Sequence, residues 1–170
     1  MVSYGVSREY AGDRMEIYLR YGPALVRKAQ RLLGSDADAR DVVQTLFVDL
    51  FAAGRSEVDL PYLYRAVTHR FLTLLRDEKN RARLLAEQAP ALRGSVRTRC
   101  DDEVIGLDLL AKLLRELPPR QSELVVYRYF DDLSQEEIAT LCGASRKTVG
   151  KDLEHVRAAV RKLRAEGGES

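Results

Sequence analysis

The sequence predicts an all-α protein of two small helical domains joined by a flexible linker, with a helix–turn–helix at the end of the second domain. Apolar residues recur at helical spacing through most of the chain, and no stretch alternates apolar and polar residues as a strand would. The periodicity fails over residues 88–102, where proline, glycine, serine and charged residues mix. The 170 residues are 45% hydrophobic and 32% charged, which suits one medium or two small soluble domains.

The first predicted domain covers residues 13–87 and follows a loose arm at residues 1–12. Its first helix runs from about Asp13 to Leu33. We expect Gly22–Pro23 to kink this helix or split it in two, because proline removes a backbone hydrogen bond and its ring clashes with the preceding turn. Gly34 is the expected stop, and Ser35 or Asp36 caps the next helix.

The second predicted helix, from about Asp36 to Ala53, has the clearest apolar face in the chain. Its apolar residues are spaced for a bundle core. The opposite side forms an acidic strip on a rigid support, although a charged outer face is usually just solvated. The strip consists of Asp38, Asp41, Gln44, Thr45 and Asp49.

A loop at residues 52–60 precedes the third predicted helix, residues 61–85, which begins with a favourable proline. Aromatic and basic side chains alternate with its apolar ones. Flat rings beside cations are what a single-stranded nucleic acid needs for stacking and phosphate contacts. The alternative is that its tyrosines are half-buried anchors at a helix start. This aromatic–basic set comprises Tyr62, Tyr64, Arg65, His69, Arg70 and Arg76.

The second predicted domain covers residues 103–170, with helices at 103–117 and 120–130 before a helical hairpin. Ser134 and Glu137 have the spacing of a capping box. Gly143 lies at the sharp turn, where positive φ favours glycine, and Ser145 can cap the last helix. That helix opens with exposed basic residues, the usual device for entering a DNA major groove. A capped hairpin with a basic surface also occurs in proteins that never bind nucleic acid.

Charge distribution supports contact with a polyanion. The net charge is only +2, but residues 65–83 and 143–165 are basic while residues 35–59 are acidic. Two basic segments on either side of a linker indicate two contacts with one polyanion, unless both are merely solvated helix faces.

Composition argues against several other classes. No apolar run approaches the roughly 18 residues of a membrane span, and the N-terminus lacks a signal-peptide core. Cys100 and Cys142 are far apart, so we expect neither a disulfide framework nor a zinc site, and we expect a reducing cytoplasm. No phosphate-binding glycine loop, metal-ligand cluster or nucleophile–base set is present. No catalytic residue, cofactor or metal is therefore predicted.

Three stretches, in order, resemble bacterial RNA polymerase sigma factors of the sigma-70 family, in the two-domain extracytoplasmic-function class. The first, RLLGSDADARDVVQTLFVDLF at residues 31–51, is similar to the family's helix that binds core polymerase. The second, PYLYRAVTHRFLTLLRDEKNR at residues 61–81, resembles the helix that engages the minus-ten promoter element. Residues 117–164 resemble the domain that reads the minus-thirty-five element. Together they cover most of the chain outside the arm and linker.

The resemblance implies a factor that binds core RNA polymerase and directs promoter-specific transcription initiation. The acidic strip would dock on the β′ clamp helices, and the β flap is an implied second contact. The loop at residues 52–60 would cradle a base flipped out of the melted minus-ten strand, which the aromatic–basic set would hold. An anti-sigma factor is a further partner that the resemblance allows. The residues implied for minus-thirty-five DNA are Arg146, Lys147, Thr148, Lys151 and His155.

The sequence also departs from the family's pattern. Tyr62 replaces a common tryptophan, and His69 and Thr73 stand where asparagine and aspartate are common. Gly150 and Asp152 lie in the last helix, and the helical wheel places Asp152 near the apolar edge, where it can pair with a neighbouring base. Two alternatives stay open: a helix–turn–helix regulator independent of polymerase, and a sigma-like decoy for an anti-sigma factor.

Overall fold

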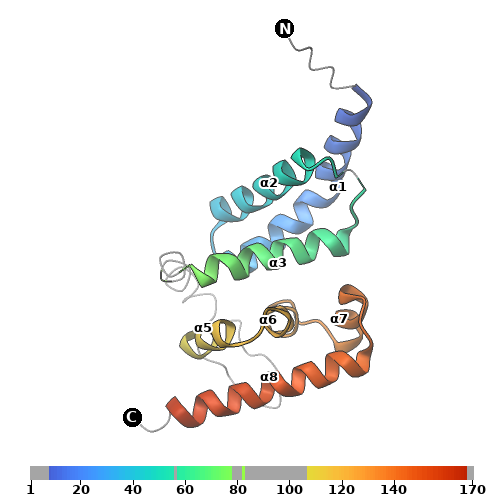
Figure 1. Ribbon diagram of the computed structural model, residues 1–170. Coiled ribbons are helices and arrows are strands. Elements are labelled where there is room, and N and C mark those ends of the chain that lie inside the picture. The colour runs from blue at the N-terminus through green and yellow to red at the C-terminus, as the bar shows by residue number, and fades with distance from the viewer. Residues whose placement is uncertain (1–7, 56, 78–81, 83–106, 168–170) are drawn as a thin grey trace.

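The computed structural model describes residues 8–55, 57–77, 82 and 107–167, and within these ranges every regular element is a helix (Figure 1). The first domain contains α1 (Arg8–Leu33), α2 (Asp36–Ala52) and α3 (Leu60–Arg76). The second contains α5 (Leu107–Glu116), α6 (Pro119–Val125), α7 (Gln135–Cys142) and α8 (Arg146–Gly167). A short π-helix, η1 (Val126–Phe130), continues α6. The all-α prediction with a terminal helix–turn–helix is confirmed; the predicted linker, residues 88–102, lies outside the described residues.

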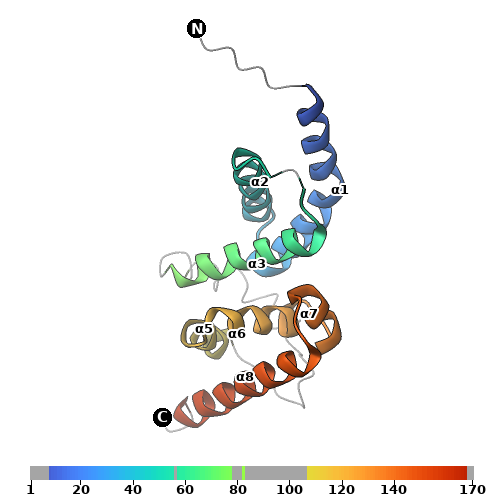
Figure 2. The same ribbon diagram turned by 45° about the vertical axis from the view of Figure 1, so that its right-hand side comes forward.

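The predicted break at Gly22–Pro23 does not divide α1. Pro23 lies inside one continuous helix, so of the two expected outcomes, a kink or a split, the split does not occur. Figures 1 and 2 show α1 bending along its length instead, which is the usual effect of a proline within a helix. The helix also begins at Arg8, earlier than its apolar pattern predicts.

Side-chain caps start the next two helices. The Oγ atom of Ser35 accepts a hydrogen bond from the Asp38 backbone N–H at 3.3 Å, and Asp59 accepts one from the Tyr62 N–H at 2.9 Å. Each bond satisfies a donor that the helix itself leaves unpaired. As the spacing predicts, the inner face of α2 is buried through Ala39, Val43, Leu46, Phe47 and Leu50.

The hairpin of α7 and α8 follows the sequence closely. Ser134 and Glu137 form both bonds of the capping box, and Gly143 has a φ of 60° in the turn. Ser145 accepts a hydrogen bond from the Thr148 N–H at 3.1 Å. One apolar stripe of α8 is buried: Val149, Leu153, Val156, Val160 and Leu163.

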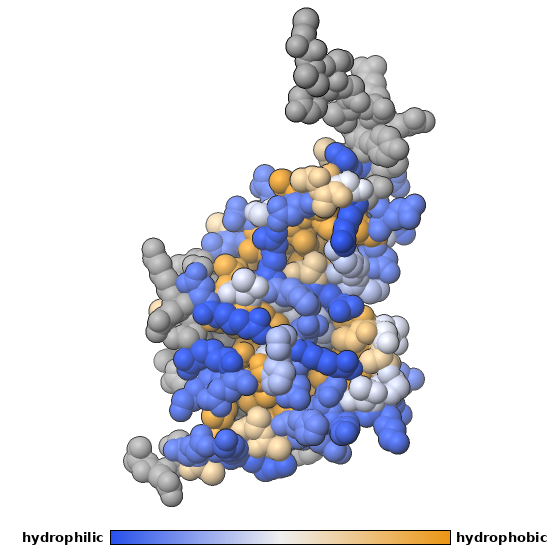
Figure 3. Space-filling view, in the orientation of Figure 1, coloured by the Kyte–Doolittle hydropathy of each residue, from blue (hydrophilic) through white to orange (hydrophobic). Residues whose placement is uncertain are grey.

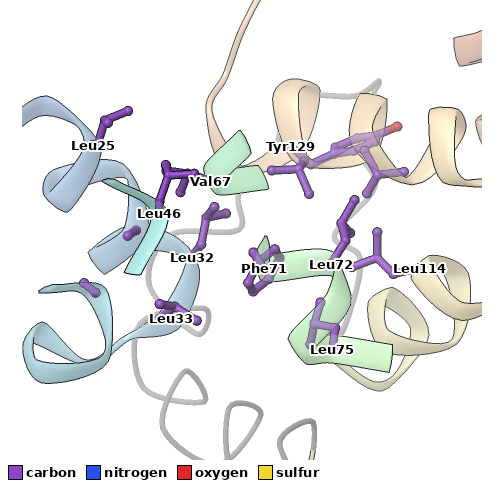
Figure 4. Close-up of a cluster of buried hydrophobic side chains, with 14 of the residues drawn as sticks. Leu25, Leu32, Leu33, Leu46, Val67, Phe71, Leu72, Leu75, Leu114 and Tyr129 are labelled. Carbon is purple, nitrogen blue, oxygen red and sulfur yellow. The ribbon is translucent and has the colours of Figure 1, made fainter. Parts of the chain in front are cut away.

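The two domains pack together, and α3 lies at their junction (Figures 1 and 2). Helix α3 contacts α1 and α2 on one side and α5, α6 and α7 on the other. The larger core cluster therefore includes residues of both domains. Figure 4 shows Leu72 of α3 beside Leu114 of α5, with Phe71 turned toward the first domain. No helix among the described residues is both long and apolar enough to cross a membrane.

Candidate nucleic-acid and polymerase interfaces

The start of α8, hereafter the recognition helix, presents basic side chains to solvent. Arg146, Lys147, Lys151 and His155 are all exposed, while the buried stripe of the helix faces α6 and α7. Lys147 and Lys151 are one turn apart and share a face. The Thr148 hydroxyl lies 2.8 Å from the Ser145 hydroxyl, so it belongs to the cap. Hydrophilic side chains cover most of the α8 surface visible in Figure 3.

Asp152, the first acid of α8, turns away from the basic face. A carboxylate oxygen of Asp152 accepts a hydrogen bond from Arg120 Nε on α6 at 2.9 Å, and the Asp152 side chain is only 19% exposed. The predicted pairing with a neighbouring base is confirmed. The bond ties the recognition helix to α6 and keeps the Asp152 carboxylate from repelling phosphate, whereas Glu154 stays exposed.

The acidic strip lies on the outer side of α2. Asp41 and Gln44 are exposed, and Thr45 is half-buried. Asp49 of α2 forms an ion pair with Arg70 of α3. Asp49 is predicted to contact polymerase and Arg70 to contact minus-ten DNA, so the structure pairs one residue from each predicted site. Asp38 is half-buried, and its backbone N–H donates the capping hydrogen bond to Ser35 Oγ.

A hollow of about 500 Å³ lies at the start of α3. Arg55 donates a hydrogen bond to the Tyr62 hydroxyl at 2.9 Å, and its guanidinium carbon is 5.9 Å from the Tyr62 ring centroid. Among the described residues, the other walls are Glu57, Val58 and Asp59. An exposed ring and a cation beside a hollow of this size can hold one stacked base.

The other members of the aromatic–basic set do not share one surface: some face the second domain and Arg76 faces solvent. Tyr64, Arg65 and His69 face the second domain, and His69 Nε2 lies 2.8 Å from Glu123 Oε1 of α6. The ring of Tyr64 stacks on that of Tyr127, with centroids 6.5 Å apart and planes 27° apart. Arg76, in the last turn of α3, is exposed. The structure therefore does not bring the set together on one open surface.

A buried ion pair joins the domains beneath Tyr64. The Lys28 Nζ atom of α1 lies 2.5 Å from Asp131 Oδ2, and both side chains are fully buried. Arg31 reaches the other oxygen of Asp131 at 3.0 Å and also the Tyr64 hydroxyl at 3.4 Å. The same ammonium is 3.7 Å from the Tyr64 ring centroid, a cation–π contact. These groups form a polar cluster across the junction that is buried at Lys28 and Asp131 and exposed at Arg31.

Burial sets the protonation behaviour of this cluster. Desolvation lowers the pKa of Lys28 to about 8, outweighing the opposing effect of Asp131. Burial also raises the pKa of Tyr64 and that of Tyr127 well above the ordinary tyrosine value. Removing water from the ammonium therefore costs more than the attraction of Asp131 returns.

Sequence reasoning missed Lys28, Arg31 and Asp131. One signal was available: Lys28 falls in line with the buried stripe of Leu25 and Leu32, where a charged residue requires a partner. Nothing in the sequence identified Asp131 as that partner. Among the described residues, no group of three or more histidine, cysteine, aspartate or glutamate side chains is placed to hold a metal ion.

Comparisons with known proteins identify two family regions in the chain. Residues 17–81 match the family model for sigma-70 region 2, and residues 107–160 match that for sigma-70 region 4. The chain is 33% identical over 141 residues to an RNA polymerase sigma-E factor of Streptomyces coelicolor, covering 81% of this chain and 78% of that protein. It is 30% identical over 142 residues to an ECF RNA polymerase sigma factor SigE of Mycolicibacterium smegmatis, covering 79% and 54%.

A solved structure is also similar: a sigma factor RpoE bound to the anti-sigma factor NepR, from Bartonella quintana. The TM-score is 0.44 at 20% identity, covering 89% of this chain and 96% of that one. The family assignment rests on the two region models and on the sequence relatives. The chain therefore belongs to the sigma-70 family, as an extracytoplasmic-function sigma factor that works with RNA polymerase in transcription initiation.

Proposed function

We propose that this sigma factor selects its promoters by placing the recognition helix in the major groove of the minus-thirty-five element. The observation that carries the assignment is the arrangement at the start of α8. Arg146, Lys147 and Lys151 are exposed there, whereas Asp152 is withdrawn to Arg120. A capped helix whose first two turns present cations on the outer face suits a polyanion, and these first turns are the part that reaches base edges; the exposed acid Glu154 comes one turn later.

Melted minus-ten DNA would bind at the start of α3. The hollow beside Arg55 and Tyr62 offers a stacking surface and a cation for an extruded base. Arg76, exposed at the other end of α3, would contact the backbone of the same strand. Tyr64, Arg65, His69 and Arg70 would complete the surface once released from their present partners.

The polymerase would dock on the acidic strip of α2, through its β′ clamp helices, with the β flap contacting the second domain. Asp41 and Gln44 are the exposed members. Charge at such a surface sets orientation and association rate more than affinity. Asp38, Thr45 and Asp49 would contribute less, because they are half-buried or already engaged.

We also propose that phosphoryl-transfer chemistry belongs to the polymerase and that this chain contributes no catalytic group or cofactor. The factor would act in the bacterial cytoplasm. Control by an anti-sigma factor stays a prediction.

The deciding experiment is co-purification with core RNA polymerase, followed by run-off transcription on a genomic fragment library. We expect stable binding and new transcripts, which would define the promoter. Binding without transcripts would indicate a decoy or altered recognition. Failure to bind polymerase, with DNA binding retained, would favour a regulator independent of polymerase.

A further inference from the structure

The second domain covers part of the surface that we assign to minus-ten DNA. Tyr64 stacks on Tyr127, and His69 is paired with Glu123. The Nε atom of Arg65 is buried and has no hydrogen-bond partner among the described residues. A base cannot stack on a ring that Tyr127 and Lys28 already occupy. The packed arrangement therefore conflicts with strand capture by these side chains.

The recognition helix is not covered in the same way. Arg146, Lys147 and Lys151 stay exposed while the domains are packed. The arrangement thus separates the DNA contacts: the major-groove contact and the Arg55–Tyr62 hollow are open, whereas the part of the single-strand surface around Tyr64 and Arg65 is covered.

Lys28, Arg31 and Asp131, which we name the latch, hold the domains in one register. Asp131 lies beyond the end of η1 in the second domain, and both of its oxygens are bound by cations of α1. It is the shared partner, so its loss would leave the buried Lys28 ammonium facing Tyr64 and Tyr127 without a counter-charge. Breaking one side of a buried pair is far more disruptive than replacing both sides with apolar groups.

Outside the latch, the junction is mainly apolar, with one polar pair between His69 and Glu123, and it is compatible with opening. Leu72 and Leu75 of α3 lie in the same cluster as Leu113 and Leu114 of α5. The orphaned Arg65 Nε atom and the desolvated Lys28 ammonium both oppose closure. Because apolar contacts are offset by these two unfavourable groups, the domains can separate when either domain gains more favourable contacts with another molecule.

We propose that the packed arrangement is a self-inhibited state, in which the latch keeps the second domain over the Tyr64–Arg65 part of the minus-ten surface until polymerase or DNA separates the domains. This inference rests on the proposed function, because it requires that α3 bind the melted strand. The ion pair fixes the relative position of the two domains, because burying the Lys28 ammonium is tolerable only where Asp131 lies beside it. Apolar contacts alone would not select one packing over another.

The test compares Asp131→Asn with Asp132→Asn in the full-length chain. Both variants remove one negative charge from the same turn. Asp132 is exposed, and its φ of 53° is one that asparagine tolerates, so Asp132→Asn is a matched control. Distances between domains would be measured by pulsed electron resonance, with spin labels on introduced cysteines at exposed Val48 of α2 and Lys162 of α8. Serine would replace both native cysteines.

We expect a single short distance in the wild type and Asp132→Asn, and a longer, broader distribution in Asp131→Asn. Affinity for a random pool of single-stranded oligonucleotides should rise on the order of tenfold in Asp131→Asn, because apparent affinity scales with the competent fraction. Affinity for nonspecific duplex DNA should stay unchanged, which also shows that α7 and α8 remain folded. The double variant Lys28→Met with Asp131→Leu should return to the short distance and to weak single-strand binding.

An unchanged short distance in Asp131→Asn would overturn the latch. Opening without a gain in single-strand affinity would overturn self-inhibition. The proposed function is judged separately by transcription with core polymerase. If Asp131→Asn opens the domains but the wild type supports no transcripts, the proposed function is refuted and the latch is not. If the wild type supports transcripts but Asp131→Asn leaves the domains packed, the latch is refuted and the proposed function is not.

Discussion

Lys147 and Lys151 carry a quantitative prediction about DNA binding. They are exposed on one face of the recognition helix, one turn apart, and among the described residues no ion pair holds either of them. Each is therefore available to one phosphate. Loss of two phosphate contacts lowers the slope of log affinity against log salt by about 1.8. Between 50 and 200 mM salt, the wild type should then lose roughly twelvefold more affinity than Lys147→Ala with Lys151→Ala.

The assay is fluorescence anisotropy with a nonspecific duplex across a salt series, so no promoter sequence is needed. Lys112→Ala with Lys162→Ala is the control, because it removes the same charge from exposed positions on α5 and on the far part of α8. The control should keep the wild-type slope. Equal slopes for all three proteins would refute the placement of the recognition helix, and equal reductions in both variants would mean that only total charge matters.

Three further predictions concern stability and partner binding. Gly150→Ala should stabilise the chain by about 1 kcal/mol in thermal unfolding, since a Cβ there meets only ordinary contact at 3.5 Å; a loss of stability would contradict this. Because burial lowers the pKa of Lys28 from 10.5 to about 8, the unfolded chain binds that proton more tightly. The free energy of unfolding should therefore rise from about pH 8 to 10 in the wild type, and Lys28→Met should lose that rise in denaturant titrations. Asp41→Arg with Gln44→Ala should reduce co-purification with core polymerase at unchanged helicity, whereas Glu166→Arg should not.

Local features of the fold were predictable because the residues that cause them are close in the chain. The Ser134–Glu137 box, the turn at Gly143 and the inward side of Asp152 all depend on neighbours within a few turns or on helical phase. The stop and start signals around Ser35 are local in the same sense. Such features follow from backbone donors, φ restrictions and the helical period.

The junction between the domains was not predictable by these means. Lys28 and Asp131 are 103 positions apart, and no periodicity relates them. The aromatic side chain of Tyr64 fits a DNA-stacking role and a packing role equally well, and only the tertiary arrangement distinguishes the two. Helix spacing indicates which face is buried, but not which of several apolar faces it meets.

The π-helical turn η1 makes the packing of the two domains depend on the number of residues between 126 and 130. The Asp131 N–H bonds to the Val126 carbonyl at 3.1 Å, five positions back, so the turn holds one residue more than an α-helical path would. That extra residue rotates everything after it by about 100°. It places Phe130 against Phe71 of α3 and carries Asp131 round to α1. Deleting a single residue between 126 and 130 would restore the α-helical pitch, leave the helix–turn–helix sequence intact, and point Asp131 away from its two cations. The number of residues in this one turn, as well as the side chain at position 131, thus governs whether the two halves of the molecule can meet in this way.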